Sequence, residues 1–422
     1  MRRSQSVLAG CCLVVAATTP LKIGVILGRD NRTSDTSDQE QWAVEQARLD
    51  VAAELEKSGG RCSIQLSTVF TGEDSESPEA LLAVRQFLKT SSANGVGLVV
   101  GAYLSEGSLL AVRGSLEPLG LTLLAPASGL PVLPPPRDRI LRFWPNDKWQ
   151  AEVLASVVRR NGTRAAVVLS RDDLTGRALA TRLASALPTE LLPHGGPLFY
   201  NATLGAASYG PLLDNLRKVI EKTSHDKVAF VCNCGPDEIS GIVDAMDSNR
   251  WPIAKTRLIL TDRSTPTRSV VATPSRRAFA AALNTSGVLS HLPTVNNPSY
   301  SRLAKRWAAI GQTGSLFASA LSAYDAVRIA ALTAVIAGGG ATVNATGLTA
   351  AVVGVADQHW GASGMMALDE SGDLYRAVYD VYEVDGEKGW RVVGAPVDAR
   401  ALPAECERRA MRCDAMRESN VE

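Results

Sequence analysis

Residues Leu21–Leu27 read LKIGVIL, a short apolar run of the kind that forms a buried strand. Further strand-like runs follow, separated by stretches with helical apolar spacing, at Gly95–Val100 and Leu121–Ala125. After the proline-rich break PVLPPP (131–136), the alternation resumes with strands at Arg164–Leu169, Lys227–Val231 and Thr256–Leu260. Alternating strands and helices predict parallel sheets covered on both faces, so the fold class is α/β. Two such runs predict two lobes with a cleft between them, where small molecules bind.

The bulk composition is that of an ordinary globular protein. The chain has 422 residues, enough for two domains, with 45% hydrophobic and 21% charged residues. Its formal net charge is +1 at pH 7, which favours neither nucleic acid nor an anionic membrane surface as a partner.

The N-terminus has the pattern of a signal peptide covering residues 1–17. Arg2 and Arg3 precede the apolar stretch Val7–Ala17, which ends in small residues suited to cleavage before Thr18. This stretch is too short to span a bilayer, and no later segment is expected to cross a membrane. We therefore expect a periplasmic or extracellular protein. Leu8–Cys11 (LAGC) resembles a lipobox, so lipid anchoring at Cys11 is the alternative.

Cysteine and histidine give no pattern for a metal site. Seven cysteines are present, two of them in the expected signal, and the five that remain cannot all pair internally. Cys406 and Cys413 lie in a charged tail, and their pairing is left open. Cys232 and Cys234 follow a strand, where we expect them on opposite faces at the end of the sheet. Without a CxxC motif and with four scattered histidines, neither metal nor cofactor is expected.

Motifs for catalysis are also missing from the sequence. It contains no GxSxG, HExxH or P-loop, and the glycines of Gly95–Gly101 lie inside a strand instead of at a strand–turn–helix junction. We therefore expect a binding protein that is not an enzyme.

Local signals place several further elements. Ser77-Pro78-Glu79 is typical of a helix start, with serine as N-cap and proline in the first turn. Ile140–Trp144 is expected to be a strand that crosses into the second lobe, and residues 263–275 a surface loop. The remaining expectations are a helix at 38–58, a short strand at 288–291, two helices within 298–337, strands at 365–368, 374–383 and 390–393, and a loose tail at 401–422.

Several segments together resemble the type I periplasmic binding protein family, specifically its leucine/isoleucine/valine-binding branch and the related receptor ligand-binding regions. They are LKIGVILG (21–28), VGLVVGAYLSEGSLLAV (96–112), GLTLLAPASGLPVL (120–133), ILRFWPNDKWQAEVLASVVRRNG (140–162), AYDAVRIAA (323–331) and ALDESGDLYRAVYDVYEVDG (367–386). The resemblance implies two Rossmann-like lobes joined by a three-crossing hinge that closes on a ligand. The expected division is 1–17 signal peptide, 18–141 plus 291–357 lobe 1, 142–290 plus 358–395 lobe 2, and 396–422 tail.

Candidate ligand contacts in the first lobe follow its strands. Ser105 heads a helix after the strand at 95–101, where its hydroxyl and free N–H groups suit a carboxylate; the alternative is a plain N-cap. By resemblance, Ser105 matches the family's carboxylate-binding position, and Ala127, Ser128 and Gly129 match its second ligand loop. Gly129 stands where the family has a threonine, which weakens the case for an α-amino acid.

Four more candidates complete the expected site. Thr175 stands where amino-acid binders of the family tend to carry an aromatic residue. Asp262 follows the strand at 256–260, where amino-acid binders of the family often have an acid that pairs with the ligand ammonium; the alternative is pairing with Arg263 or Arg268 at the surface. Trp42, expected in the first turn of its helix, and Tyr103 are either stacking contacts or core residues.

The resemblance implies an extracytoplasmic solute-binding protein. It would capture a small polar ligand, an amino acid or amide-like molecule, for the permease of an ABC-type importer. The alternative is a ligand-sensing or regulatory module of the same fold that acts through a protein partner.

Overall fold

The computed structural model divides into two compact units. Unit 1 comprises residues 1–146 and 292–375, and unit 2 comprises residues 147–291 and 376–422. The structure describes residues 20–399 except 29–34, 60–62, 72–75, 103, 130–138, 193–194, 202–204, 206–208, 223–224, 226, 266–267, 293, 295–296, 313–314, 338–344 and 376. The expected signal peptide and residues 400–422 of the expected tail, with Cys11, Cys406 and Cys413, therefore lie outside the described residues, as does Tyr103. The expected start of the tail at residue 396 was wrong, because Val397–Asp398 form a strand that pairs with Val378–Tyr379.

Unit 1 is built on a parallel five-stranded sheet in the order β2-β1-β3-β4-β5. Its strands are β1 (Leu21–Leu27), β2 (Ile64–Phe70), β3 (Leu98–Gly101), β4 (Thr122–Ala125) and β5 (Ile140–Arg142). The strand expected to cross between lobes is thus the edge strand of this sheet. Because all five strands run the same way, their carboxyl ends form one edge, where ligand-binding loops of open α/β sheets lie.

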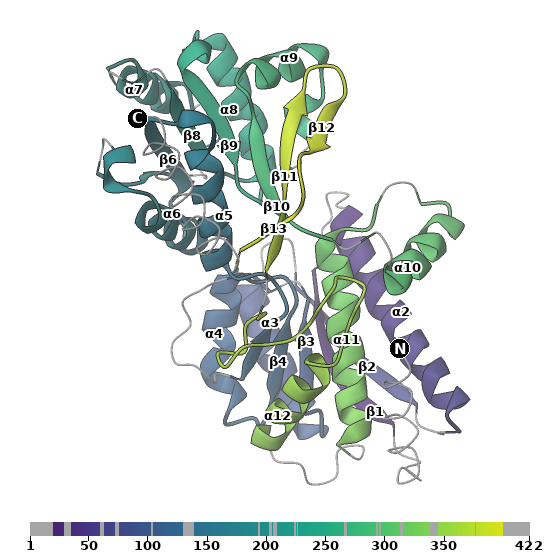
Figure 1. The fold of residues 1–422 in the computed structure, drawn as a ribbon. Helices are drawn as coiled ribbons and strands as arrows, with labels where there is room; N and C mark the ends of the chain where they lie inside the picture. The colour runs from purple at the N-terminus through teal and green to yellow at the C-terminus, as the bar shows by residue number, and fades with distance from the viewer. Residues whose placement is uncertain are drawn as a thin grey trace, which may run out of the picture. The chain divides into compact units, whose positions relative to one another are not determined.

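Helices cover both faces of this sheet (Figure 1). Alternate strand residues point to opposite faces, so Leu98 and Val100 of β3 pack on one side and Val99 on the other. One face is covered by α2 (Asp35–Lys57), α10 (Pro298–Ala309), α11 (Ala318–Ile336) and α12 (Ala345–Ala356), the other by α3 (Pro78–Ala93) and α4 (Glu106–Leu116). The purple α2 and green α11 lie side by side, although they are far apart in the sequence.

Unit 2 is built on a mixed eight-stranded sheet, in the order β12-β11-β10-β9-β8-β6-β7 with β13 beside β11. Strands β6 to β10 are parallel, and β11, β12 and β13 extend the sheet in antiparallel pairs. The strands are β6 (Ala165–Arg171), β7 (Leu198–Tyr200), β8 (Val228–Asn233), β9 (Thr256–Leu260), β10 (Ser286–Ser290), β11 (Val378–Asp385), β12 (Gly389–Val392) and β13 (Val397–Asp398).

The second sheet also has two apolar faces. One packs against α5 (Asp147–Arg159) and α6 (Leu174–Ala186), the other against α7 (Tyr209–Lys222), α8 (Pro236–Ser248) and α9 (Pro274–Ala282). Val167 and Leu169 face α7 and α8, whereas Val168 faces α5 and α6, again by strand alternation. Short 3₁₀ turns lie at Arg160–Gly162, Thr189–Leu191, Ile253–Lys255 and Arg268–Val271.

The third boundary between the units differs from the expected one. The division falls after Tyr375 instead of after residue 357, so the segment 358–375 belongs to unit 1. Met366, Leu368 and Leu374 pack in the unit 1 core, and Arg142 of β5 forms a buried ion pair with Asp373 at 3.1 Å. Residues 365–368 form isolated bridges in place of the expected strand.

The cysteine pair corrects another expectation. Cys232 and Cys234 are joined by a disulfide and lie in the same apolar cluster, on the same face of the sheet. Residues two apart in an extended chain point to the same side, so the prediction of opposite faces was wrong.

One described helix, α11, is long and apolar enough to cross a membrane by length and composition. Most of it is buried against α2 and the sheet of unit 1, as expected of a core helix in a two-layer packing.

Candidate functional site

Six of the expected ligand contacts lie at the carboxyl edges of the two sheets, in the loops where the parallel strands end. Ser105 and the segment Ala127–Gly129 follow β3 and β4 in unit 1, and Thr175 and Asp262 follow β6 and β9 in unit 2. The two groups belong to different units, and each is described within its own.

Ser105 is the N-cap of α4, and its hydroxyl already has partners. Its Oγ accepts a hydrogen bond from the Ser108 N–H at 3.1 Å and donates one to Glu76 Oε1 at 2.7 Å. The carboxylate of Glu76 packs against the first turn of α4, because a Cβ atom added at Gly107 would lie 2.5 Å from Glu76 Cδ. Negative charge is favoured at a helix N-terminus, so Glu76 stands where a ligand carboxylate was expected.

Glu76 is a residue that sequence reasoning missed. It lies directly before Ser77, the N-cap of α3, whose Oγ accepts a hydrogen bond from the Ala80 N–H at 3.2 Å. The capping pattern drew attention to the residues after Ser77. The starts of α3 and α4 lie close together only because β2 and β3, which precede these helices, run parallel on either side of β1.

The loop after β4 holds an unsatisfied hydroxyl. Ser128 is fully buried, and its Oγ has no hydrogen-bond partner among the residues that the structure describes. Ala127 beside it is partly exposed and Gly129 is buried. A buried hydroxyl without a partner costs about 1–3 kcal/mol, so this loop has unused hydrogen-bonding capacity.

Trp42 packs inside unit 1. Its ring meets Trp307 of α10 edge to face, with centroids 5.0 Å apart. Because α2 begins at Asp35, Trp42 lies beyond the first turn in which it was expected. This contact supports the core alternative, and a stacking role for Trp42 stays a prediction.

Charged side chains gather after β6 and β8 in unit 2. Asp173 caps α6 by accepting a hydrogen bond from the Gly176 N–H at 2.6 Å, which positions the neighbouring Thr175 in the first turn. Arg171 contacts Asp173 at 3.0 Å and Glu238 of α8 at 3.5 Å, and Arg263 contacts Asp173 at 3.8 Å. Arg171 and Glu238 were not predicted, and Arg263 was considered only as an alternative ion-pair partner of Asp262. Arg171 is the last residue of β6, and Arg263 adjoins Asp262.

Beneath these charges, a buried polar network links three strand ends. The Asn233 side-chain amide donates to Ser170 Oγ at 2.9 Å, and Thr261 Oγ1 donates to Asn233 Oδ1 at 3.1 Å. Ser170 Oγ donates in turn to the Gly176 carbonyl at 2.9 Å. Asn233 lies between the two disulfide-bonded cysteines, so a covalent ring fixes the backbone at the centre of the network.

Asp262 lies in the turn that follows β9. It is partly buried. Burial is the main cause that raises the pKa of the Tyr379 phenol, and the nearby charge of Asp262 raises it further. Asp147, at the start of α5, contributes in the same direction. The carboxylates of Asp262 and Asp147 are therefore both near the Tyr379 phenol. A role for Asp262 in binding an ammonium group stays a prediction.

The AYDAV segment of α11 has a structural role. Tyr324 donates to Asp50 of α2 at 2.7 Å. The buried Asp325 accepts hydrogen bonds from the N–H groups of Ala362 and Ser363, both at 2.8 Å. These bonds link α2 and the segment after α12 to the central helix of unit 1, and they give both polar side chains partners inside the core.

No cluster of three or more His, Cys, Asp or Glu side chains suited to a metal ion occurs within the described ranges. The expectation that the protein works without metal or cofactor stays a prediction.

Comparison with known proteins identifies the family. The profile of the family described as "Receptor family ligand binding region" matches residues 39–387. The chain therefore belongs to this family, and its two α/β units have the fold of the type I periplasmic binding proteins, as predicted. An uncharacterized protein of Methanocaldococcus jannaschii is 20% identical over 291 residues, covering 65% of this chain and 67% of that protein.

Solved structures of similar fold are substrate-binding proteins. A leucine-binding protein LivK from Thermotoga maritima has a TM-score of 0.65 at 16% identity, covering 89% of this chain and 98% of its own. A branched-chain amino acid binding protein LivJ from Streptococcus pneumoniae, solved with isoleucine, has a TM-score of 0.62 at 16% identity and coverages of 89% and 99%. A solute-binding protein from R. palustris, solved with 4-hydroxybenzoate, has a TM-score of 0.65 at 14% identity and coverages of 90% and 96%. The ligands of these neighbours include both amino acids and benzoates.

Proposed function

We propose that this protein is an extracytoplasmic solute-binding protein that captures a small polar ligand for an ABC-type importer. The observation that carries the proposal is the concentration of polar and charged groups where the parallel strands of each unit end, in a chain whose family profile covers residues 39–387. Ser105 and Ser128 supply hydroxyls in unit 1, and Asp262 supplies a carboxylate in unit 2. Binding and release need no chemistry on the ligand, because differential affinity of two conformations suffices.

The charge at α4 bears on the ligand class. A ligand carboxylate at this helix would meet the carboxylate of Glu76, and like charges at such distances repel. We therefore expect a ligand that presents an ammonium, amide N–H or hydroxyl group to Glu76 and Ser105. An amide or amine fits this requirement better than the carboxyl end of a free amino acid.

An exported location is part of the proposal. Residues 1–17 have the pattern of a signal peptide, and the Cys232–Cys234 disulfide is a bond that persists in oxidising compartments outside the cytoplasm. The family is described as a receptor ligand-binding region, and this description supports a second candidate function, that of a ligand-sensing module that acts through a protein partner.

A thermal-shift screen of the protein beginning at Thr18 tests the proposal. The panel contains amino acids, amides, amines, small organic acids, nucleosides and sugars. A ligand that binds only the folded state adds about 2.7 kcal/mol of stability at a hundredfold excess over its Kd. Asp262→Ala and Ser105→Ala should weaken the effect of the best ligand, and Lys218→Ala on α7, away from these loops, is the control.

A separate variant tests the argument about the charge of Glu76. Glu76→Gln should improve binding of carboxylate-bearing members of the panel and weaken binding of amines. A folded protein that responds to no member of the panel would contradict solute capture and favour the sensing module. Co-purification with a permease would distinguish the importer role from the sensing role.

A further inference from the structure

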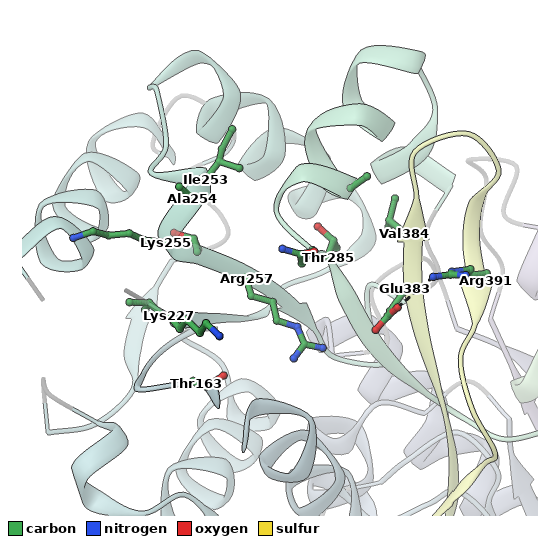
Figure 2. A pocket seen from close by; sticks show the side chains of 14 residues that line it. Thr163, Lys227, Ile253, Ala254, Lys255, Arg257, Thr285, Glu383, Val384 and Arg391 are labelled. Carbon is green, nitrogen blue, oxygen red and sulfur yellow. Dashed lines mark ion pairs between the residues drawn. The ribbon is translucent and has the colours of Figure 1, made fainter. Parts of the chain in front are cut away.

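A polar cavity of about 510 Å³ lies in unit 2, away from the loops described above (Figure 2). It opens at the amino ends of β6, β8 and β9, where Thr163, Lys227 and Thr256 stand at or just before the strands. The carboxyl-edge residues of the candidate site follow these same strands, so the cavity is at the opposite edge of the sheet. Its volume falls within the range of small-molecule sites and greatly exceeds the space of a single ion.

The cavity is strongly basic. Among the described residues that line it, four are cationic, namely Lys227, Lys255, Arg257 and Arg391, and one is anionic, Glu383. Glu383 is an ion-pair partner of Arg391 at 3.7 Å, on the neighbouring strands β11 and β12. Figure 2 shows the Arg257 side chain extending between Lys227 on one side and Glu383 on the other. The residues that line the cavity therefore carry more positive than negative charge, although the net charge of the whole chain is only +1.

Arg257 is held in place by uncharged partners. Its Nη1 donates to the Val157 carbonyl at 3.2 Å, and its Nη2 donates to Ser286 Oγ at 3.1 Å. Burial lowers the pKa of Arg257, Glu383 opposes this change, and Arg160 adds to it through like-charge repulsion. Glu383 is also the ion-pair partner of Arg391, so one carboxylate accompanies two guanidinium groups, and a partly buried cation gains from a further anion.

Thr285 supplies an independent sign of a ligand. It lines the cavity just before β10 and is 1% exposed, yet its Oγ1 has no hydrogen-bond partner in the described part of the chain. Its backbone is fixed, since Thr285 N–H donates to the Ala280 carbonyl at 3.0 Å and its own carbonyl accepts from Val384 N–H at 2.9 Å. A buried hydroxyl in a fixed position would gain a hydrogen bond from a bound acceptor.

We propose that this cavity binds a small phosphate-bearing molecule, with Lys227 and Arg257 contacting its phosphate oxygens and Thr285 donating a hydrogen bond, while Lys255, whose ammonium points away from these groups in Figure 2, adds only long-range attraction. Lysine and arginine are the usual partners of phosphate, and guanidinium groups bind it with two parallel N–H bonds. The volume beyond the phosphate accommodates an organic group or a second phosphate. The site is independent of the proposed solute ligand, because it uses the opposite edge of the sheet.

Isothermal titration calorimetry with inorganic pyrophosphate tests this site in the full-length mature protein. Each titration is matched in ionic strength with sodium chloride, because screening weakens exposed charge pairs. We expect 1:1 binding to the wild-type protein and roughly tenfold weaker binding for Lys227→Ala, which removes a hydrogen bond between charged groups. Lys255→Ala should weaken binding less, because the Lys255 ammonium points away from the proposed phosphate contacts in Figure 2. Lys218→Ala, an exposed lysine on α7 of the same unit, should bind as the wild type does.

Thr285→Val separates a ligand contact from a structural role. Because the threonine hydroxyl has no described partner, the variant should keep the melting temperature of the ligand-free protein while binding pyrophosphate several-fold more weakly. Asp262→Ala should bind pyrophosphate normally, which distinguishes this site from the candidate solute site. Absence of pyrophosphate binding by the folded wild type, or an equal loss of binding in Lys218→Ala and the cavity variants, would overturn the proposal.

Discussion

Glu40 is the buried carboxyl group with the clearest consequence for stability. It lies on α2, is 3% exposed and has a hydrogen bond with Ser319 of α11. Burial raises its pKa from 4.5 to about 7, and the hydrogen bond only partly opposes that rise. Glu40 is therefore protonated in the folded protein at pH values at which an unfolded chain would have ionised it.

The stability of the protein should fall as the pH rises from about 4.5 to about 7. Over this interval the folded state binds more protons than the unfolded state, so the free energy of unfolding decreases, by up to about 3 kcal/mol. Glu40→Gln should remove this decrease, which makes the variant more stable than the wild type at pH 8 and similar to it at pH 4.5. Urea unfolding at a series of pH values measures the difference.

The matched control for Glu40 is Glu56, an exposed carboxylate on the same helix. Glu56→Gln should leave the pH profile of the wild type unchanged. A Glu40→Gln profile parallel to that of the wild type would show that Glu40 does not carry the pH dependence.

Residues that act locally could be predicted from the sequence, and residues that act across the fold could not. Ser77 and Ser105 were predicted as helix starts, and both cap their helices, because capping depends on neighbours three positions away. Glu76 reaches Ser105 across 29 residues, and no periodicity indicates such a contact. The partners of Asp173 on β6 and after β9 were missed for the same reason.

At the scale of elements, the strand pattern predicted most strands of both sheets. β1 and β9 have the predicted bounds, and the other strands of the first runs differ by a few residues at their ends. The helix α9 was missed because Ser, Thr, Pro and Arg dominate 263–275, although Thr273 as N-cap and Pro274 at the first position are a helix start. The helix α12 and the short β7 were also missed. α12 carries no charged residue to mark an exposed face.

A matched pair of helical glycines tests how tightly α6 packs against its strand. A Cβ atom at Gly176 would overlap the Arg171 carbonyl, whereas a Cβ atom at Gly114 of α4 would meet nothing within 4 Å. Gly176→Ala should therefore lower the free energy of unfolding by about 1–3 kcal/mol, because backbone has to move. Gly114→Ala should raise it by roughly 0.5–1 kcal/mol, the usual gain of alanine over glycine in a helix.

Denaturant unfolding of the two variants measures both effects. The two changes in the free energy of unfolding need not be equal in size; the prediction is that they differ in sign. If Gly176→Ala proved as stable as Gly114→Ala, the close approach of α6 to the end of β6 would be contradicted.

At the scale of the whole molecule, two α/β units could be predicted, and one of their boundaries could not. The segment 358–375 follows a helix of unit 1 and precedes a strand of unit 2, so its sequence alone suits either. Its assignment depends on long-range contacts, namely the Arg142–Asp373 ion pair and the hydrogen bonds of Asp325 to Ala362 and Ser363.

The proposed export of the protein predicts its mature covalent form. Expressed with its own leader in an exporting bacterial host, the protein should begin at Thr18 and contain the Cys232–Cys234 disulfide. N-terminal sequencing and intact mass, before and after reduction, measure both features. A chain that retains Met1, or one with a lipid on Cys11, would contradict cleavage before Thr18.

Glu76 at the start of α4 also bears on how ligand preference could change during evolution. A carboxylate of the protein at a helix N-terminus should disfavour anionic solutes there. This preference depends on the single side chain of Glu76, which is not part of the apolar core. A single base change converts a glutamate codon into a glutamine codon. A lineage carrying this fold could therefore exchange cationic for anionic nutrients in one mutational step, without repacking any apolar residue.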